Sequence, residues 1–146
     1  MKKNLIVAAL LFLSGVGFGQ TTQHEFECLT SKLTFELPGD FRTHHSHYEK
    51  GYFEIFFRQD TINHLDTTRL SIHCGGWDEP HDLSDSVYKV EQTSELGRSG
   101  TQSNGRFWRE LNFPDKYYIF YQDATTEEKK LFDQVIEEIL VQLKVE

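Results

Sequence analysis

The sequence predicts an α+β fold: an antiparallel β-sheet on which a mid-chain helix and a long C-terminal amphipathic helix pack. Two observations lead to this prediction. Short segments in which apolar and polar residues alternate, bounded by turn-forming residues, recur along the chain. The C-terminal segment instead repeats apolar residues with the period of a helix. No internal repeat or linker-like tract divides the 146 residues, so we expect one folded domain.

The N-terminal segment reads as a secretory signal peptide. Met1–Asn4 is basic, Leu5–Leu13 is an unbroken apolar run, and Ser14–Gly19 is rich in small residues. We expect cleavage before Gln20, which leaves residues 20–146 as one exported domain, periplasmic or secreted. The apolar run is shorter than the ~20 residues that a spanning helix needs, so we expect no membrane insertion after cleavage.

The composition and charge exclude some classes of partner. Hydrophobic residues make up 38% of the chain and aromatic residues 14%, which is enough to bury a core. The formal net charge is −8, and removal of residues 1–19 takes away two lysines and no acid, giving −10. Nucleic acids and anionic membranes need a cationic face, so neither is an expected partner. A protein with a basic surface is the expected one.

The first strands follow from alternation. Lys32–Leu37 places three apolar residues on one face and runs into a turn at Pro38–Asp40. Gly51–Arg58 alternates in the same way. Thr67–Cys74 turns Leu70, Ile72 and Cys74 inward and Arg69, Ser71 and His73 outward.

Two later runs form a predicted hairpin. Arg106–Phe113 and Lys116–Gln122 flank the turn residues Pro114 and Asp115. The second run carries aromatic residues on both faces, which is typical of a central strand or one covered on both sides.

A mid-chain helix is expected from Asp82. Leu83, Val87 and Val90 follow with helical spacing, and Gly97 is a natural C-cap. The polar, glycine-rich stretch from Gly97 to Gly105 is then expected to be a mobile surface loop.

The C-terminal helix is the clearest element. Thr125 and Glu128 have the spacing of a capping box. An apolar stripe follows, which predicts a helix packed on a sheet: Phe132, Val135, Ile136, Ile139, Leu140 and Leu143.

These elements together resemble a known family. The opening strand and turn read Leu33-x-Phe35-x-Leu37-Pro38-x-x-Phe41, a helix is expected from Asp82, and the chain closes with strand Tyr117–Gln122 and helix Phe132–Leu143. Over residues 30–145 this order resembles the PsbP-like superfamily, which includes many small exported bacterial proteins. The resemblance implies a binding or assembly role and no reaction. It offers no shared site motif, so no functional residue is carried over.

The two cysteines, Cys28 and Cys74, have three possible roles. In an oxidising compartment an even number of cysteines favours a disulfide, which is our expectation. Two free buried thiols are the alternative. Redox or metal chemistry is the least favoured role, because the chain has no C-x-x-C spacing.

A histidine cluster, His44–His47, is the sharpest local feature. In an extended segment His45 and His47 share a face, and two imidazoles at that spacing can chelate Zn²⁺ or Cu²⁺. A tight site needs a third ligand, for which we favour His73; the other candidates are His24, Glu49 and His64. The alternative is a solvated polar strand or loop that happens to be rich in histidine.

The remaining features favour binding over catalysis. The chain carries no G-x-S-x-G, H-E-x-x-H, P-loop or G-x-G-x-x-G motif, so we expect no enzyme and no cofactor. Trp77, Trp108 and Arg109 are candidate contact residues for a protein partner. We therefore expect a non-enzymatic binding or assembly-accessory module. A periplasmic metal-binding protein that uses His44–His47 is the alternative, and a small hydrolase around Asp78 and His81 is the third possibility.

Overall fold

The computed structural model describes residues 19–48, 51–58, 68–75, 87–113 and 116–144, and the statements below concern these ranges. They form nine strands and one helix: β1 (Thr21–Cys28), β2 (Ser31–Pro38), β3 (Phe41–Tyr48), β4 (Gly51–Arg58), β5 (Arg69–Cys74), β6 (Tyr88–Thr93), β7 (Gly97–Gln102), β8 (Phe107–Phe113), β9 (Tyr117–Ala124) and α1 (Thr126–Leu143). The predicted α+β class with antiparallel strands and a closing helix is confirmed. No helix within these ranges has both the length and the apolar character to span a bilayer.

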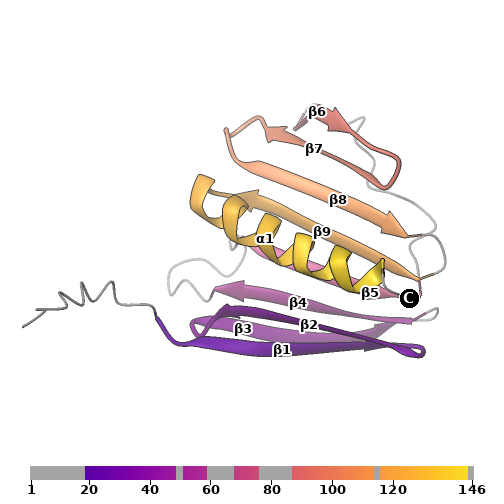
Figure 1. Ribbon diagram of the computed structural model, residues 1–146. Coiled ribbons are helices and arrows are strands. Elements are labelled where there is room, and N and C mark those ends of the chain that lie inside the picture. The colour runs from indigo at the N-terminus through magenta and orange to yellow at the C-terminus, as the bar shows by residue number, and fades with distance from the viewer. Residues whose placement is uncertain (1–18, 49–50, 59–67, 76–86, 114–115, 145–146) are drawn as a thin grey trace, which may run out of the picture.

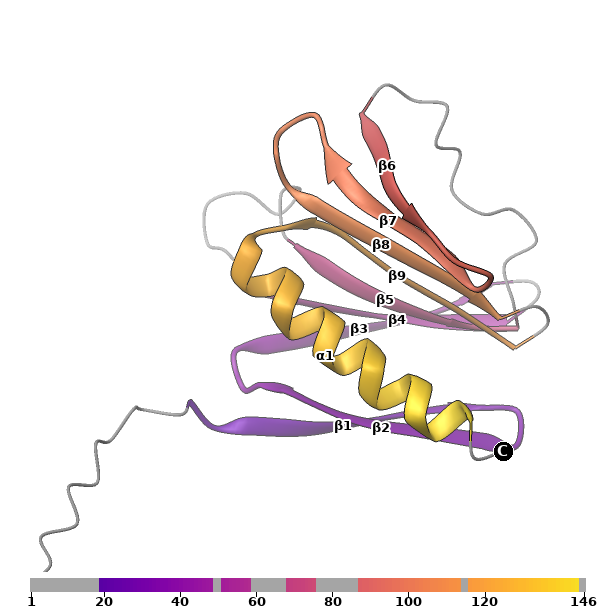
Figure 2. The ribbon, with the colours of Figure 1, turned by 45° about the horizontal axis from the view of Figure 1, so that its top comes forward.

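The strands form two sheets that lie in two layers. Seven strands make one antiparallel sheet in the order β3-β4-β5-β9-β8-β7-β6, and β1 pairs with β2 as a separate hairpin. Figures 1 and 2 show α1 and the β1–β2 hairpin side by side over one face of the seven-stranded sheet. The central place of β9, with Tyr117 to Tyr121 buried on both faces, confirms the prediction from its aromatic pattern.

The main core lies between these two layers. The hairpin contributes Phe26, Leu33, Phe35 and Leu37, the sheet contributes Phe56, Leu70, Ile72 and Ile119, and the helix contributes Phe132, Val135, Ile136 and Ile139. The alternation predicted for Leu33, Phe35 and Leu37 is therefore confirmed. Each such side chain stabilises the fold by about 1.5–3 kcal/mol when it leaves water, which makes this core the main source of stability.

The start of α1 is fixed by the predicted capping box. The backbone N–H of Glu128 donates to Thr125 Oγ1 at 3.2 Å, and the backbone N–H of Thr125 donates to the Glu128 carboxylate at 3.0 Å. These two bonds satisfy two backbone N–H groups at the start of α1 that have no hydrogen-bond partner inside the helix.

The predicted mid-chain helix is wrong for the part of it that the structure describes. Tyr88–Thr93 is strand β6, the edge of the large sheet, and pairs antiparallel with β7. Tyr, Val and Thr favour strands, and Tyr88 packs edge-on against Trp108, so tertiary pairing outweighs a helical spacing carried by only three apolar residues. Asp82 and Leu83 lie outside the described residues.

The mobile loop predicted over Gly97–Gly105 is wrong in its first six residues. They form β7, which lies between β6 and β8. At Gly100 an added Cβ would collide with the carbonyl oxygen of Lys89 on β6. The glycine therefore allows close strand pairing here, whereas Gly105, with φ of +78°, sits in the turn that follows.

A disulfide joins the two layers. Cys28 on β1 is bonded to Cys74 on β5, with a Cα–Cα distance of 5.4 Å, which confirms the expected bridge. The bond closes a loop of 46 residues. On the chain-entropy account a loop of that size stabilises the fold by roughly 4 kcal/mol.

Candidate functional site

A cleft of about 710 Å³ opens between α1 and the β6–β7 end of the large sheet. Figure 2 shows β6 and β7 standing away from α1 beyond β8. Most of the lining residues are polar or charged, and we call this feature the polar cleft. Its strand wall includes Glu91 and Ser99, its floor Arg109 and Tyr121, and its helix wall Asp133 and Glu137.

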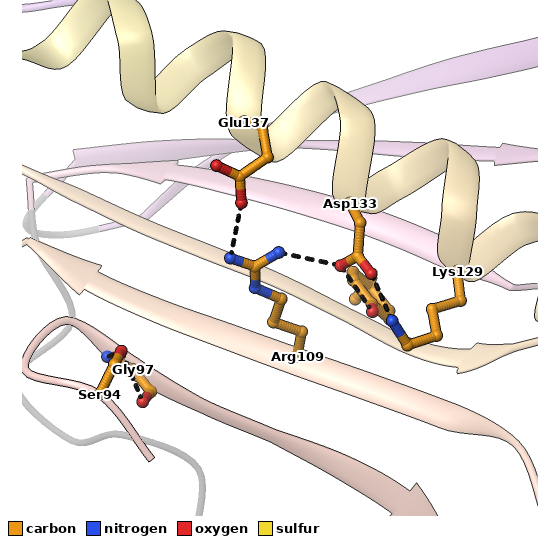
Figure 3. Close-up of polar contacts among 7 residues, drawn as sticks. Ser94, Gly97, Arg109, Lys129, Asp133 and Glu137 are labelled. Carbon is orange, nitrogen blue, oxygen red and sulfur yellow. Dashed lines mark hydrogen bonds and ion pairs between the residues drawn. The ribbon is translucent and has the colours of Figure 1, made fainter. Parts of the chain in front are cut away.

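An ion-pair network fixes the helix wall to the floor. Arg109 of β8 donates from Nη1 to Asp133 at 3.0 Å and from Nη2 to Glu137 at 3.1 Å (Figure 3). Tyr121 donates its hydroxyl hydrogen to Asp133 Oδ1 at 3.0 Å, and Lys129 donates to the other oxygen of the same carboxylate. Asp133 therefore accepts from three side chains that come from three different elements.

The pKa values in this network follow from burial and pairing. Burial alone would raise the pKa of Asp133, but hydrogen bonds from Lys129 and Arg109 outweigh it and lower the pKa. Burial and the neighbouring Asp133 raise the pKa of Tyr121. Burial acts to lower the pKa of Arg109, yet its bonds to Asp133 and Glu137 raise it. At neutral pH Asp133 and Arg109 are therefore charged, and Tyr121 is neutral.

The strand wall combines a tight turn with both short and long side chains, the long ones being Glu91, Gln92 and Arg98. The hairpin turn between β6 and β7 is closed by the Ser94 N–H, which donates to the Gly97 carbonyl oxygen at 2.8 Å. Ser99 lies directly opposite Arg109 in the pairing of β7 with β8. Gly97 and Ser99, which also line the cleft, place little side-chain volume above its floor.

The structure separates the three residues predicted to contact a partner. Arg109 lies on the floor of the polar cleft, as described. Trp108 is fully buried on the other face of the sheet, where its Nε1–H donates to the Thr101 carbonyl oxygen at 3.2 Å. It therefore packs on the sheet and is not available to a partner. Trp77 lies outside the described residues.

The histidine cluster is brought together only in part. His45 and His47 share a face of β3, with 3.1 Å between their Nε2 atoms, but His73 lies on the opposite face of the sheet, against Phe53. The expected third ligand is therefore wrong. Glu54 is the nearer carboxylate, with its Oε1 3.2 Å from His45 Nδ1. Among the residues that the structure describes, no group of three or more histidine, cysteine, aspartate or glutamate side chains could hold a metal ion.

The other proposed ligands do not complete the cluster either. His24 of β1 packs against both Phe35 and Phe56, and burial lowers its pKa although Glu54 acts to raise it. Glu49 and His64 lie outside the described ranges, as do Asp78 and His81 of the hydrolase reading.

Sequence reasoning missed the residues that depend on tertiary register. Asp133 and Glu137 lie outside the apolar stripe of the predicted helix, and no motif in the sequence singles them out. Their i, i+4 spacing is the signal that marks them as one edge of that helix. Glu54 shares a face with His45 only because β3 and β4 pair residue 45 with residue 54.

Comparisons with protein-family models, curated proteins and solved structures give no match. The resemblance to the PsbP-like superfamily therefore stays a prediction, and it loses one of its supporting features, the mid-chain helix, over residues 88–93.

Proposed function

We propose that this chain is a small acidic exported protein that acts as a non-enzymatic binding module, and that a basic segment of a protein partner lies in the polar cleft. The observation that carries the proposal is the cleft itself: about 710 Å³ of open space with charged walls on two different elements.

The lining of the cleft favours a polypeptide over a small apolar ligand. Sites for small molecules are mostly apolar, with a few polar groups that fix orientation. Here the charged and polar side chains predominate, and Leu111 and Tyr121 supply little apolar surface. A peptide segment can match such a lining with its own backbone and charged side chains.

The charges favour a basic segment. Arg109 already pairs with two carboxylates, so it adds little attraction for an anionic ligand. Glu137 of the helix wall pairs with Arg109 and Glu91 of the strand wall pairs with Lys89, yet their side chains are 64% and 42% exposed, so each wall still presents a carboxylate to solvent. The net charge of −10 expected after signal cleavage would speed the approach of a basic partner.

The Arg109 network prepares the cleft for binding. Because Arg109 ties β8 to α1, the helix wall is held in place before any partner arrives. A preformed site loses less conformational entropy on binding, which raises affinity without added contacts.

A pair of charge reversals on α1 tests the proposal. Residues 20–146 are immobilised through a C-terminal tag, used to capture proteins from the exported fraction of the source cells, and compared with Glu137→Lys and Glu138→Lys. Both variants change the net charge equally, but Glu138 faces away from the cleft and bonds to Gln134 on its own helix. We expect one stoichiometric partner on the unmodified chain and on Glu138→Lys, and its loss on Glu137→Lys. Equal capture by both variants, or no partner on the unmodified chain, would contradict the proposal; matching melting temperatures exclude misfolding.

A further inference from the structure

We propose that His45 and His47 chelate a divalent transition-metal ion through their Nε2 atoms, with Glu54 as the residue that positions His45. The inference is independent of the polar cleft, because β3 and β6 are the two opposite edges of the large sheet.

The local fold places the two imidazoles side by side. In β3 the side chains of residues 45 and 47 point to the same face, two residues apart. The antiparallel partner β4 presents Glu54 directly opposite His45 and Tyr52 directly opposite His47. Tyr52 packs against both imidazole rings, with centroids 5.2 and 5.9 Å away, which limits the orientations that the rings can adopt.

Glu54 sets the tautomer of His45. An ionised carboxylate only accepts hydrogen bonds, so its Oε1, 3.2 Å from His45 Nδ1, requires the proton on Nδ1. In the neutral ring Nε2 then carries the free lone pair, which is the atom that faces His47. This is the carboxylate–histidine–metal arrangement that orients histidine ligands in known metal sites.

The spacing of the two nitrogen atoms fits a shared metal ion. Two imidazole nitrogens bound at about 2.0–2.1 Å to one ion lie about 2.9 Å apart at a right angle and about 3.4 Å apart at a tetrahedral angle. The observed distance of 3.1 Å falls between these values. A hydrogen bond between the two imidazole rings also fits this distance. Adding metal ions distinguishes a chelating pair from a hydrogen-bonded pair.

The chemistry of the donors selects the metal. Imidazole suits Cu²⁺, Ni²⁺ and Zn²⁺, and the order of affinities places Cu²⁺ first. His45 is 44% exposed on an edge strand, so the remaining coordination positions are open to water or to a donor from another molecule. The site therefore has two protein ligands, in agreement with the absence of any larger donor group among the described residues.

Titration with CuCl₂ tests the site. Residues 20–146, prepared without a histidine tag, are followed by calorimetry and by NMR of the histidine rings. We expect one site per chain, with early paramagnetic broadening of the His45 and His47 signals, and at least tenfold weaker binding in His45→Ala or His47→Ala.

A neighbouring histidine supplies the matched control. His44 lies on the same strand with its side chain on the opposite face, so His44→Ala removes an imidazole without touching the pair. We expect that variant to bind Cu²⁺ as the unmodified chain does. We also expect Glu54→Gln to weaken binding about tenfold without changing the melting temperature of the metal-free protein. No binding by the unmodified chain, unbroadened His45 and His47 signals, or equal losses in His44→Ala and His45→Ala would overturn the site.

Discussion

At the scale of single residues, Asp133 is the group on which the polar cleft most depends. Its carboxylate accepts from Arg109, Lys129 and Tyr121, and its side chain is 25% exposed. Hydrogen bonds to a charged group in such surroundings stabilise a fold by about 1.5–3 kcal/mol. Loss of the charge would leave two cations and a buried hydroxyl with weaker partners.

We therefore expect Asp133→Asn to lower the free energy of unfolding by about 1–3 kcal/mol, measured by urea denaturation. Glu138→Gln, which alters a half-buried carboxylate on the same helix that bonds only to Gln134 among the described residues, is the control and should change the free energy of unfolding by less than about 0.5 kcal/mol. Equal effects of the two substitutions would show that the network does not stabilise α1 against β8.

His24 gives the protein a pH-dependent stability. Burial lowers its pKa from the ordinary 6.5, more strongly than Glu54 raises it, so below that pH the unfolded chain binds a proton more readily than the folded one. Stability from this residue is present above pH 6.5 and is lost as the pH falls through the lower, folded-state pKa.

We expect the melting temperature to fall between pH 7 and pH 5, and His24→Phe to flatten this dependence, because phenylalanine keeps the packing against Phe35 and Phe56. The measurement is a series of thermal melts across that range. The control is His44→Phe, an exposed position, which should keep the dependence of the unmodified chain. A His24→Phe profile as steep as that of the unmodified chain would exclude His24 as the cause.

At the scale of elements, the sequence predicts the parts of the fold whose burial follows a simple period. β2, β4, β5, β8, β9 and α1 were all expected, since each carries a regular apolar face. The other strands were missed or misread for a physical reason. β1 and β3 mix exposed polar residues with few buried ones. β6 and β7 carry no regular apolar face, and their pairing combines a close backbone contact at Gly100 with isolated side-chain contacts such as Tyr88 against Trp108.

The candidate sites likewise combine residues that the sequence marks with residues that only the fold brings to them. Arg109, His45 and His47 could be selected from residue type and spacing. Their partners Asp133, Glu137 and Glu54 come from the register between elements, which spacing alone does not determine. The sequence predicts that His73 points outward from its own strand, but this does not determine whether His73 and His45 share a face of the sheet. That depends on how β3 pairs with β4 and how β4 pairs with β5.

The role of Gly100 tests the strand assignment of β7. We expect Gly100→Ala to destabilise the fold by about 1–3 kcal/mol, because the added methyl group meets the Lys89 carbonyl oxygen on β6. Ser99→Ala, one residue earlier, should have little effect on urea denaturation. A loop at this position would tolerate both changes equally, and that result would contradict a paired β7.

At the scale of the whole molecule, the Cys28–Cys74 bond connects the hairpin layer to the large sheet. We expect the double variant Cys28→Ala, Cys74→Ala to lose up to about 4 kcal/mol of stability, with the same secondary structure by circular dichroism. Urea denaturation of the oxidised and reduced unmodified chain provides the comparison. Equal stability of the two forms would show that the core alone fixes the hairpin on the sheet.

The proposed binding function also belongs to the whole molecule, since the polar cleft exists only where α1 meets the β6–β7 end of the sheet. Hydrogen exchange of the chain, free and with its captured partner, tests this most directly. We predict slower exchange on binding in residues 88–102, the strand wall, and around Glu137 on α1. Unchanged exchange there, with protection confined to β1–β2 or to β3–β4, would contradict the assignment of the cleft as the binding site.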